Sequence, residues 1–205
     1  MPSNSSPNTY DSRLADALTR RRFDPSIRPL PALLSLQDLL DAQYCNSLTQ
    51  DLAAGGRAWE VQRATPELWQ QIPDKPGLYM FVLAPHLRLK MAHPETETTL
   101  PRALYVGRAG SASGSGTLKS RYRSEYKNYV CSDPDRLWED VSGNERKLML
   151  RKYLNLWPLQ YWYLEVEERD KIARLETGLI KLLNPPLNAQ GTARLRPVGL
   201  AGPAF

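Results

Sequence analysis

Five residues after position 75 have side chains suited to phosphate chemistry, and they are Tyr79, Tyr105, Arg121, Glu176 and Asn188. The two tyrosines lie in short apolar runs, 26 residues apart, and each is two residues from a glycine. Hydrolysis of a phosphodiester needs an activated water, groups that neutralise transition-state charge, and help for the leaving oxygen. Two phenols, a guanidinium, a carboxylate and an amide can divide these tasks among them.

The carboxylate and the guanidinium have the clearest physical roles. Glu176 can hold one hard divalent cation, Mg²⁺ or Mn²⁺, that keeps most of its waters. Such a cation acts as a Lewis acid on the leaving oxygen. Because Glu176 is the one acidic residue of the set, we expect a single metal ion rather than two. The planar fork of Arg121 suits the non-bridging oxygens of a phosphate.

Strands and helices at regular places would hold these side chains. Apolar periodicity, prolines and glycines predict strands and helices after residue 73. The strands are expected at 77–83, 103–107 and 159–167, and the helices at about 117–128, 136–157 (broken near Ser142 and Gly143) and 169–183. This order predicts a small α+β fold.

The N-terminal third carries no chemical motif, and we expect it to be all-helical. Helices are predicted at 11–22, from an N-cap at Ser35 to Gly55-Gly56, and briefly after Thr65-Pro66. The expected organisation is a disordered lead at 1–10, a helical extension at 11–72, a main domain at 73–190 and a loose tail at 191–205. Residues 84–101 read as a long connection.

Composition narrows the function classes. The chain of 205 residues is 41% hydrophobic with five tryptophans, which is typical of a folded globule. No apolar run approaches the roughly 20 residues of a membrane helix, and the polar N-terminus has no signal core, so we expect a cytoplasmic protein without a membrane partner. Two distant cysteines and two histidines disfavour zinc and indicate reduced thiols.

Positive charge is concentrated in one segment. The whole chain has a net charge of +5, and residues 102–130 alone have the same net charge, because they contain six basic residues and one glutamate. A local basic patch of this kind suits a polyanion, although a solvated basic helix would look the same. The residues of this patch that we expect to contact nucleic acid are Arg108, Lys119, Arg123 and Lys127.

Together these motifs resemble the GIY-YIG nuclease superfamily over roughly residues 74–190. Each motif alone is weak, but all of them occur in the expected order. They are Gly77-Leu78-Tyr79, Tyr105-Val106-Gly107, Leu118-Lys119-Ser120-Arg121, Glu176 within Arg174–Lys181, and Asn188 after Asn184-Pro185-Pro186-Leu187.

The resemblance implies a fold and a role for each residue. The fold would be a small three-stranded mixed or antiparallel sheet flanked by helices, with the N-terminal segment as an extension. Tyr79 would be the general base, and either a nearby cation or a metal-bound water could lower its pKa enough for the phenolate to take a proton from water. Tyr105 would position water or phosphate, Glu176 would bind the metal, and Asn188 would join the tyrosine hairpin to the last helix.

One position departs from the family pattern. Many members carry a histidine or a tyrosine four residues after the arginine, whereas here that residue is Glu125, followed by Tyr126. Which residue assists Tyr79 therefore stays open, with Tyr126 as the candidate helper. The 84–101 connection is also long, and it reads either as a DNA-contacting insertion or as an ordinary surface excursion.

Two functions from different classes follow. The first is a metal-dependent DNA endonuclease, of restriction type, in which the N-terminal helices contribute binding or specificity. Its substrate would be double-stranded DNA, with single strands as an alternative. The second is a non-catalytic nucleic-acid-binding or assembly protein that keeps the GIY-YIG fold.

Overall fold

The computed structural model describes residues 9–23, 27, 30, 36–85, 87, 89–91, 96–110, 114–140 and 146–188. The predicted tail at 191–205, the cap at Ser35 and the break near Ser142 and Gly143 lie outside these residues. So does the predicted lead, except at its end, where helix α1 (Thr9–Arg20) already begins. The first predicted helix is confirmed by α1.

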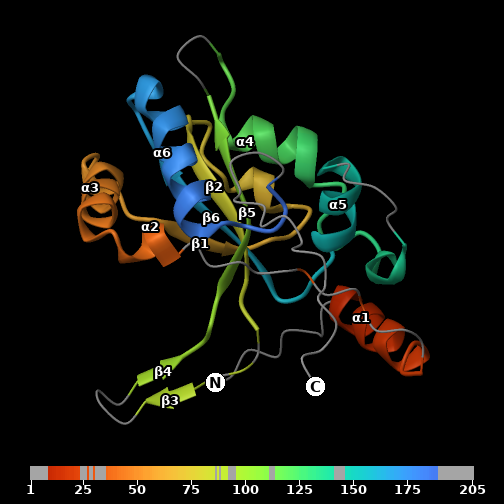
Figure 1. Cartoon of the computed structure of the whole chain (residues 1–205). Helices are drawn as coiled ribbons and strands as arrows, with labels where there is room; N and C mark the ends of the chain where they lie inside the picture. Colours follow the sequence, from red (N-terminus) through yellow and green to blue (C-terminus); the bar gives the residue numbers. More distant parts are fainter. Residues whose placement is uncertain are drawn as a thin grey trace, which may run out of the picture.

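The centre of the molecule is a four-stranded antiparallel sheet with the order β1-β6-β2-β5 (Figure 1). Its strands are β1 (Glu60–Arg63), β2 (Gly77–Leu83), β5 (Arg102–Ala109) and β6 (Leu159–Glu165). The three predicted strands and the α+β class are confirmed. The predicted count of three strands is wrong, because β1 pairs with β6 along its whole length.

Strand β1 also corrects the expectation that residues 11–72 are all helical. Its four residues, Glu-Val-Gln-Arg, contain a single apolar side chain, and Val61 remains exposed at the sheet edge. So short and polar a run has no period-2 signal that a sequence pattern can detect. The N-terminal segment therefore contributes a strand to the same sheet as the residues after 73.

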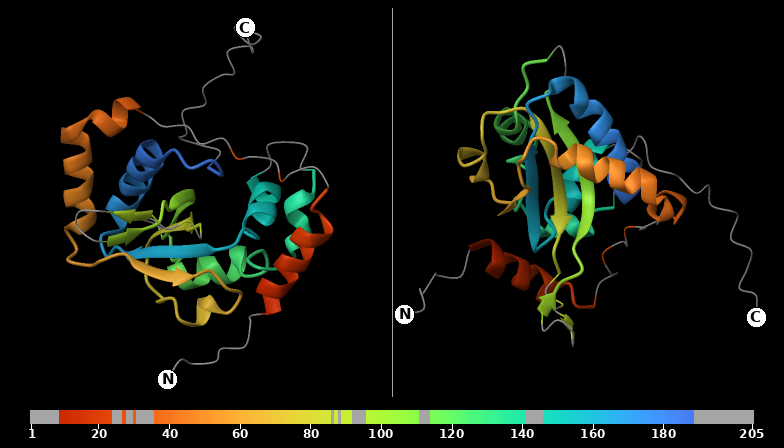
Figure 2. Two further views of the ribbon diagram at one scale, coloured as in Figure 1. Left: turned by 90° about the horizontal axis from the view of Figure 1, so that it is seen from below. Right: turned by 90° about the vertical axis from the view of Figure 1, so that its left-hand side faces the viewer.

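Helices cover both faces of the sheet, and this explains why β2 is apolar throughout (Figure 2). Successive side chains of a strand point to opposite faces. Leu78, Met80 and Val82 pack with α6 (Arg169–Leu183) and with α3 (Ala42–Ala53). Tyr79 and Phe81 face the other way, into a cluster of aromatic rings. That second face is covered by 3-10 helix η1 (Leu68–Gln70), α4 (Leu118–Arg121), η2 (Tyr122–Tyr126) and α5 (Arg146–Tyr153).

The predicted single helix from 35 to 54 is two helices, α2 (Leu36–Leu40) and α3. Asp41 separates them, because its side chain accepts a hydrogen bond from the backbone N–H of Tyr44 at 3.0 Å and so caps a new helix. Helix α3 then lies against α6 at Gly178. A Cβ at Gly178 would come 2.9 Å from Leu48, so a glycine lets the helices approach.

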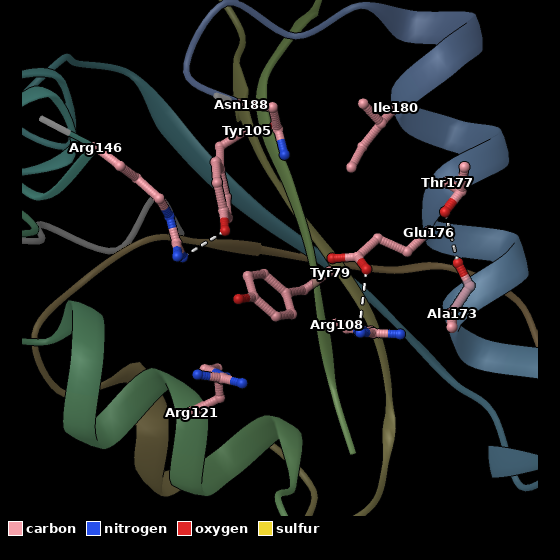
Figure 3. A pocket seen from close by; sticks show the side chains of 10 residues that line it. All are labelled: Tyr79, Tyr105, Arg108, Arg121, Arg146, Ala173, Glu176, Thr177, Ile180 and Asn188. Carbon is pink, nitrogen blue, oxygen red and sulfur yellow. Dashed lines mark hydrogen bonds and ion pairs between the residues drawn. The ribbon is translucent and has the colours of Figure 1, made fainter. Parts of the chain in front are cut away.

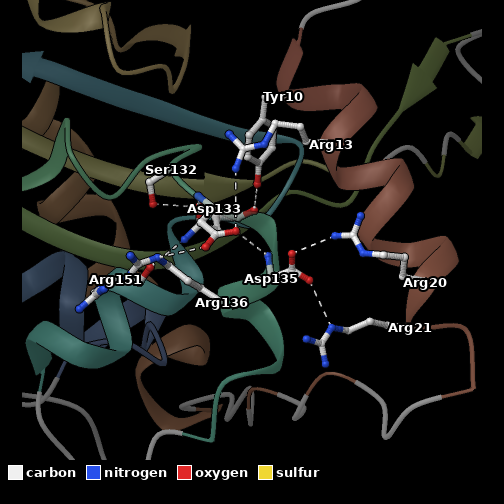
Figure 4. Close-up of polar contacts among 10 residues, drawn as sticks. Tyr10, Arg13, Arg20, Arg21, Ser132, Asp133, Asp135, Arg136 and Arg151 are labelled. Carbon is white, nitrogen blue, oxygen red and sulfur yellow. Dashed lines mark hydrogen bonds and ion pairs between the residues drawn. The ribbon is translucent and has the colours of Figure 1, made fainter.

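Helix α1 lies on the other side of the molecule from α2 and α3 (Figure 1). There it contacts the 3-10 helix η3 (Pro134–Trp138) (Figure 4). Arg20 and Arg21 bind the two carboxylate oxygens of Asp135, at 2.9 and 3.3 Å. The hydroxyl of Tyr10 donates to the backbone carbonyl of Asn155. Helices η3 and α5 confirm the prediction of a mostly helical stretch at 136–157.

The long connection after β2 contains a two-stranded antiparallel ribbon, β3 (Leu89–Met91) with β4 (Thr96–Thr98), which projects from the sheet (Figure 1). A ribbon was not expected there. Cys45 and Cys131 are free thiols, as predicted. Among the helices that the structure describes, none has the length and apolar character needed to cross a membrane.

Candidate active site

The predicted catalytic residues line a single pocket of about 710 Å³ (Figure 3). They come from β2, β5, α4, α6 and the segment after α6. The full lining is Tyr79, Tyr105, Arg108, Arg121, Arg146, Ala173, Glu176, Thr177, Ile180 and Asn188. Residues nearly 100 positions apart in the chain, such as Tyr79 and Glu176, therefore meet in one place.

Sheet register explains the glycine of the Tyr105-Val106-Gly107 motif. In the antiparallel pair β2–β5, Tyr79 lies opposite Gly107. A Cβ added at Gly107 would lie 2.5 Å from both Cζ and Oη of Tyr79. The ring of Tyr79 therefore occupies the space that any other residue at 107 would need for its side chain.

The hydroxyl of Tyr79 forms a hydrogen bond with the hydroxyl of Tyr126, at 2.6 Å. Tyr126 ends η2, a π-helical turn in which the N–H of Lys127 donates to the carbonyl of Tyr122 at 3.0 Å. A π-turn holds one residue more than an α-helical turn. Tyr126, five residues after Arg121, thereby reaches Tyr79, and the candidate helper is in contact with the proposed base.

Burial sets the protonation of these phenols. Tyr79 is 1% exposed, and loss of water together with the neighbouring Tyr126, Tyr105 and Tyr161 raises its pKa well above the ordinary tyrosine value. The pKa of Tyr126 is raised as well, chiefly by burial. In the protein alone, the Tyr79–Tyr126 pair is therefore neutral at physiological pH.

The carboxylate of Glu176 reaches into the pocket from α6. Its side chain is 21% exposed, and one oxygen lies 3.1 Å from Nε of Arg108. Burial raises the pKa of Glu176, while the positive charges of Arg108, Arg146 and Arg121 act in the opposite direction. Three guanidiniums of the pocket lining thus act on this one carboxylate, which makes the pocket a basic one.

The donor set can be compared with the expected metal ion. Glu176 is the one carboxylate that lines the pocket, and no group of three or more His, Cys, Asp or Glu residues gathers anywhere in the described ranges. A single oxygen ligand fits one hard cation that keeps its water shell, such as Mg²⁺ or Mn²⁺. Arg108 holds the same carboxylate and must compete with such an ion.

This competition predicts a gain of metal affinity in one variant. Arg108→Gln should bind Mn²⁺ about three- to tenfold more tightly than the wild type in the absence of DNA, because the carboxylate loses its ion-pair partner. Titration calorimetry measures the affinity. Arg174→Gln is the matched control, since Arg174 lies on α6 but pairs with Asp51 of α3, at 2.6 Å. Equal affinities of Arg108→Gln and wild type would show that Arg108 does not compete for Glu176.

Asn188 has the geometry of a structural link. Its Oδ1 accepts from the N–H of Val106 at 2.9 Å, and its Nδ2 donates to the carbonyl of Val106 at 2.8 Å. The N–H of Leu187 also donates to the carbonyl of Leu104 at 2.9 Å. The amide thus fastens the segment after α6 to the centre of β5, as expected from the sequence.

Of the four predicted nucleic-acid contacts, Arg108 lines the pocket, and Lys119, Arg123 and Lys127 do not. Arg123 and Lys127 lie over the ring of Trp69, at 4.9 and 5.9 Å from its centroid. The basic segment therefore has two sides, and only one of them faces the pocket.

The sequence prediction missed Arg146, the first residue of α5. Its Nη2 donates to the hydroxyl of Tyr105 at 2.6 Å, and its guanidinium carbon lies 5.1 Å from the centre of that ring. An arginine beside a lysine on a helix is common, so the sequence contains no signal that could have identified it.

Comparison of the chain with protein-family models, with curated proteins and with solved structures found no match.

Proposed function

We propose that this protein is a metal-dependent endonuclease that hydrolyses phosphodiester bonds of DNA, with a site of the GIY-YIG type. The observation that carries the proposal is the convergence of Tyr79, Tyr105, Arg121, Glu176 and Asn188 on one basic pocket. Each of these residues belongs to a separate sequence motif, and they come from separate elements. A purely structural role for each would not require them to share a cavity.

Each side chain has a task in the proposed reaction. Arg121 presents its guanidinium to the non-bridging phosphate oxygens and offsets the charge that grows in the transition state. Tyr105 orients the phosphate or the attacking water, and Asn188 keeps β5 in place. Mg²⁺ or Mn²⁺, held through Glu176, would supply Lewis-acid stabilisation of the leaving oxygen.

Tyr79 takes the proton of the attacking water in this scheme. Because burial raises the pKa of Tyr79, only a small fraction is phenolate at neutral pH, and that fraction grows as the pH rises. The guanidinium of Arg121 interacts electrostatically with Tyr79 and favours its charged form. The hydroxyl of Tyr126 is within hydrogen-bond distance of the hydroxyl oxygen of Tyr79, at 2.6 Å.

A pH profile tests the assignment of the base. The cleavage rate should rise about tenfold per pH unit from neutral pH upward, without a plateau below the ordinary tyrosine pKa of about 10. Incorporation of 3-fluorotyrosine at Tyr79, which makes the phenol more acidic, should shift the profile to lower pH. The same analogue at Tyr44, on α3, is the control. A profile unmoved by the analogue at Tyr79 would remove that residue from the role of base.

The whole proposal is tested by direct cleavage. Wild-type protein is incubated with supercoiled plasmid, linear duplex, single-stranded DNA and RNA, each with Mg²⁺, with Mn²⁺ or with EDTA. We expect nicking or linearisation of duplex DNA with either metal and none with EDTA. Discrete fragments would identify a restriction-type enzyme. Binding without metal-dependent cleavage would instead support the non-catalytic nucleic-acid-binding function.

A further inference from the structure

Arg146 enters the pocket from α5, an element that carries none of the sequence motifs. Figure 3 shows it reaching in from α5, across the pocket from α6, which carries Glu176. Its side chain is 46% exposed. Besides Tyr105, its Nη2 lies 3.5 Å from the hydroxyl of Tyr126 and 3.7 Å from Oε2 of Glu125. Arg146 therefore touches two of the site's phenols without being enclosed by protein.

One end of the guanidinium makes all of these contacts. Nη2 is within hydrogen-bond distance of the hydroxyls of Tyr105 and Tyr126 and forms an ion pair with Glu125. Nη1 and Nε have no hydrogen-bond partner in the part of the chain that the structure describes. An arginine has five N–H donors in a rigid fork, which matches the spacing of phosphate oxygens. Arg146 is thus anchored at one nitrogen and can offer its other donors to an anion in the pocket.

Glu125 connects this arginine to Arg121. One carboxylate oxygen, Oε1, binds Nη1 of Arg121, and the other, Oε2, faces Nη2 of Arg146. The two arginines come from different elements, α4 and α5, and the shared carboxylate links them. Glu125 itself does not line the pocket. The residue at the place of the expected helper is therefore placed to orient two guanidiniums.

The charges around the pocket support an anionic ligand held by both arginines. Glu176 is paired with Arg108, whereas Glu125 is shared between Arg121 and Arg146. Three guanidiniums against two carboxylates leave one positive charge, and it lies on the Arg121–Arg146 side. A phosphate that entered between these two side chains would complete the charge balance.

We infer that Arg146 is a second phosphate-contacting residue of this site, and that Glu125 is a positioning residue that sets Arg146 and Arg121 at the spacing of one phosphodiester. The inference rests on the proposed function. It adds a catalytic residue outside the motifs and assigns a role to the residue that departs from the family pattern.

The binding test uses the full-length protein and duplex DNA in EDTA, where cleavage is not expected. Arg146→Ala should lower the slope of log affinity against log salt concentration by about one, the signature of one lost phosphate contact. Lys147→Ala removes the same charge from the next position of α5 and is the matched control. A slope equal to that of the wild type would overturn the inference for Arg146.

The turnover test separates contact from positioning. With metal present, Arg146→Ala should lower kcat about a hundredfold, and Arg146→Lys should restore salt-dependent binding but little of kcat, because a point charge cannot replace the fork. Glu125→Gln should lower kcat with unchanged melting temperature and with KM unchanged or lower. In the Glu125→Gln background, Arg146→Ala should cost clearly less than in the wild type. Additive losses would overturn the role of Glu125.

The outcomes for the two proposals differ. If wild-type protein cleaves no DNA under any condition, the endonuclease proposal fails, and the salt slope still decides whether Arg146 contacts phosphate. If the wild type cleaves DNA and Arg146→Ala cleaves it at the same rate and with the same slope, the endonuclease proposal stands and the inference about Arg146 fails.

Discussion

Replacement of Glu176 by glutamine is expected to lower metal-dependent cleavage about a thousandfold or more, which corresponds to about 4 kcal/mol of lost transition-state stabilisation. Glutamine keeps the shape of the side chain but removes the charge that would hold the cation. The fold should persist, because the lost ion pair with Arg108 is partly exposed and contributes no more than about 1 kcal/mol.

Glu165 provides a matched control for this variant. Its side chain is also 21% exposed and is also paired with an arginine, Arg57, at 2.8 Å, but it lies on β6 away from the pocket. Cleavage by Glu165→Gln should equal that of the wild type, and calorimetric Mn²⁺ binding should be lost only in Glu176→Gln. Equal cleavage by the two variants would contradict the assignment of Glu176 as the metal ligand.

The second large effect is expected from Gly107→Ala, which adds a single methyl group. That carbon would lie 2.5 Å from Tyr79, so the ring must move or the strands must separate. We expect a loss of about 1–3 kcal/mol in the free energy of unfolding. Because a small displacement of a reacting group is costly, cleavage should fall about a hundredfold.

Thermal unfolding and cleavage rates measure these two losses separately. Gly55→Ala is the control, since a Cβ at Gly55 meets no atom within 4 Å. Because Tyr79→Ala removes the ring that the added methyl group would meet, Gly107→Ala should cost less stability in the Tyr79→Ala background than in the wild type. If Gly107→Ala unfolds and cleaves like the wild type, the close contact between Gly107 and Tyr79 has no consequence for the site.

The elements with strong local patterns were predictable from sequence. The continuous apolar run at 77–83 and the helical stripe of 169–183 became β2 and α6 with the predicted bounds. Strand β1 was missed because its stability comes from pairing with β6, which is nearly 100 residues later. The cap at Asp41 was missed because one aspartate can continue a helix or begin one, and only its hydrogen bond to the backbone distinguishes the two.

In the candidate site, too, features with a local sequence pattern were predictable, and features that depend on contacts between elements were not. Its motif residues could be identified because each stands at a fixed place beside a glycine, a leucine or a helix end. The contact between Tyr79 and Tyr126 could not, since it depends on the π-helical turn that brings the fifth residue after Arg121 into reach. Arg146 could not be found either, because its importance lies in three contacts made across elements.

The attachment of Asn188 to β5 has a consequence for self-association. Strand β5 is an edge strand of the sheet. The unpaired backbone N–H and C=O groups of an edge strand can pair with a strand of another molecule. Here the amide of Asn188 occupies both backbone groups of Val106, and Leu187 takes the carbonyl of Leu104. A second copy of the chain cannot extend the sheet across the centre of β5 without breaking these bonds. The asparagine thus protects the molecule from edge-to-edge aggregation beside its own pocket.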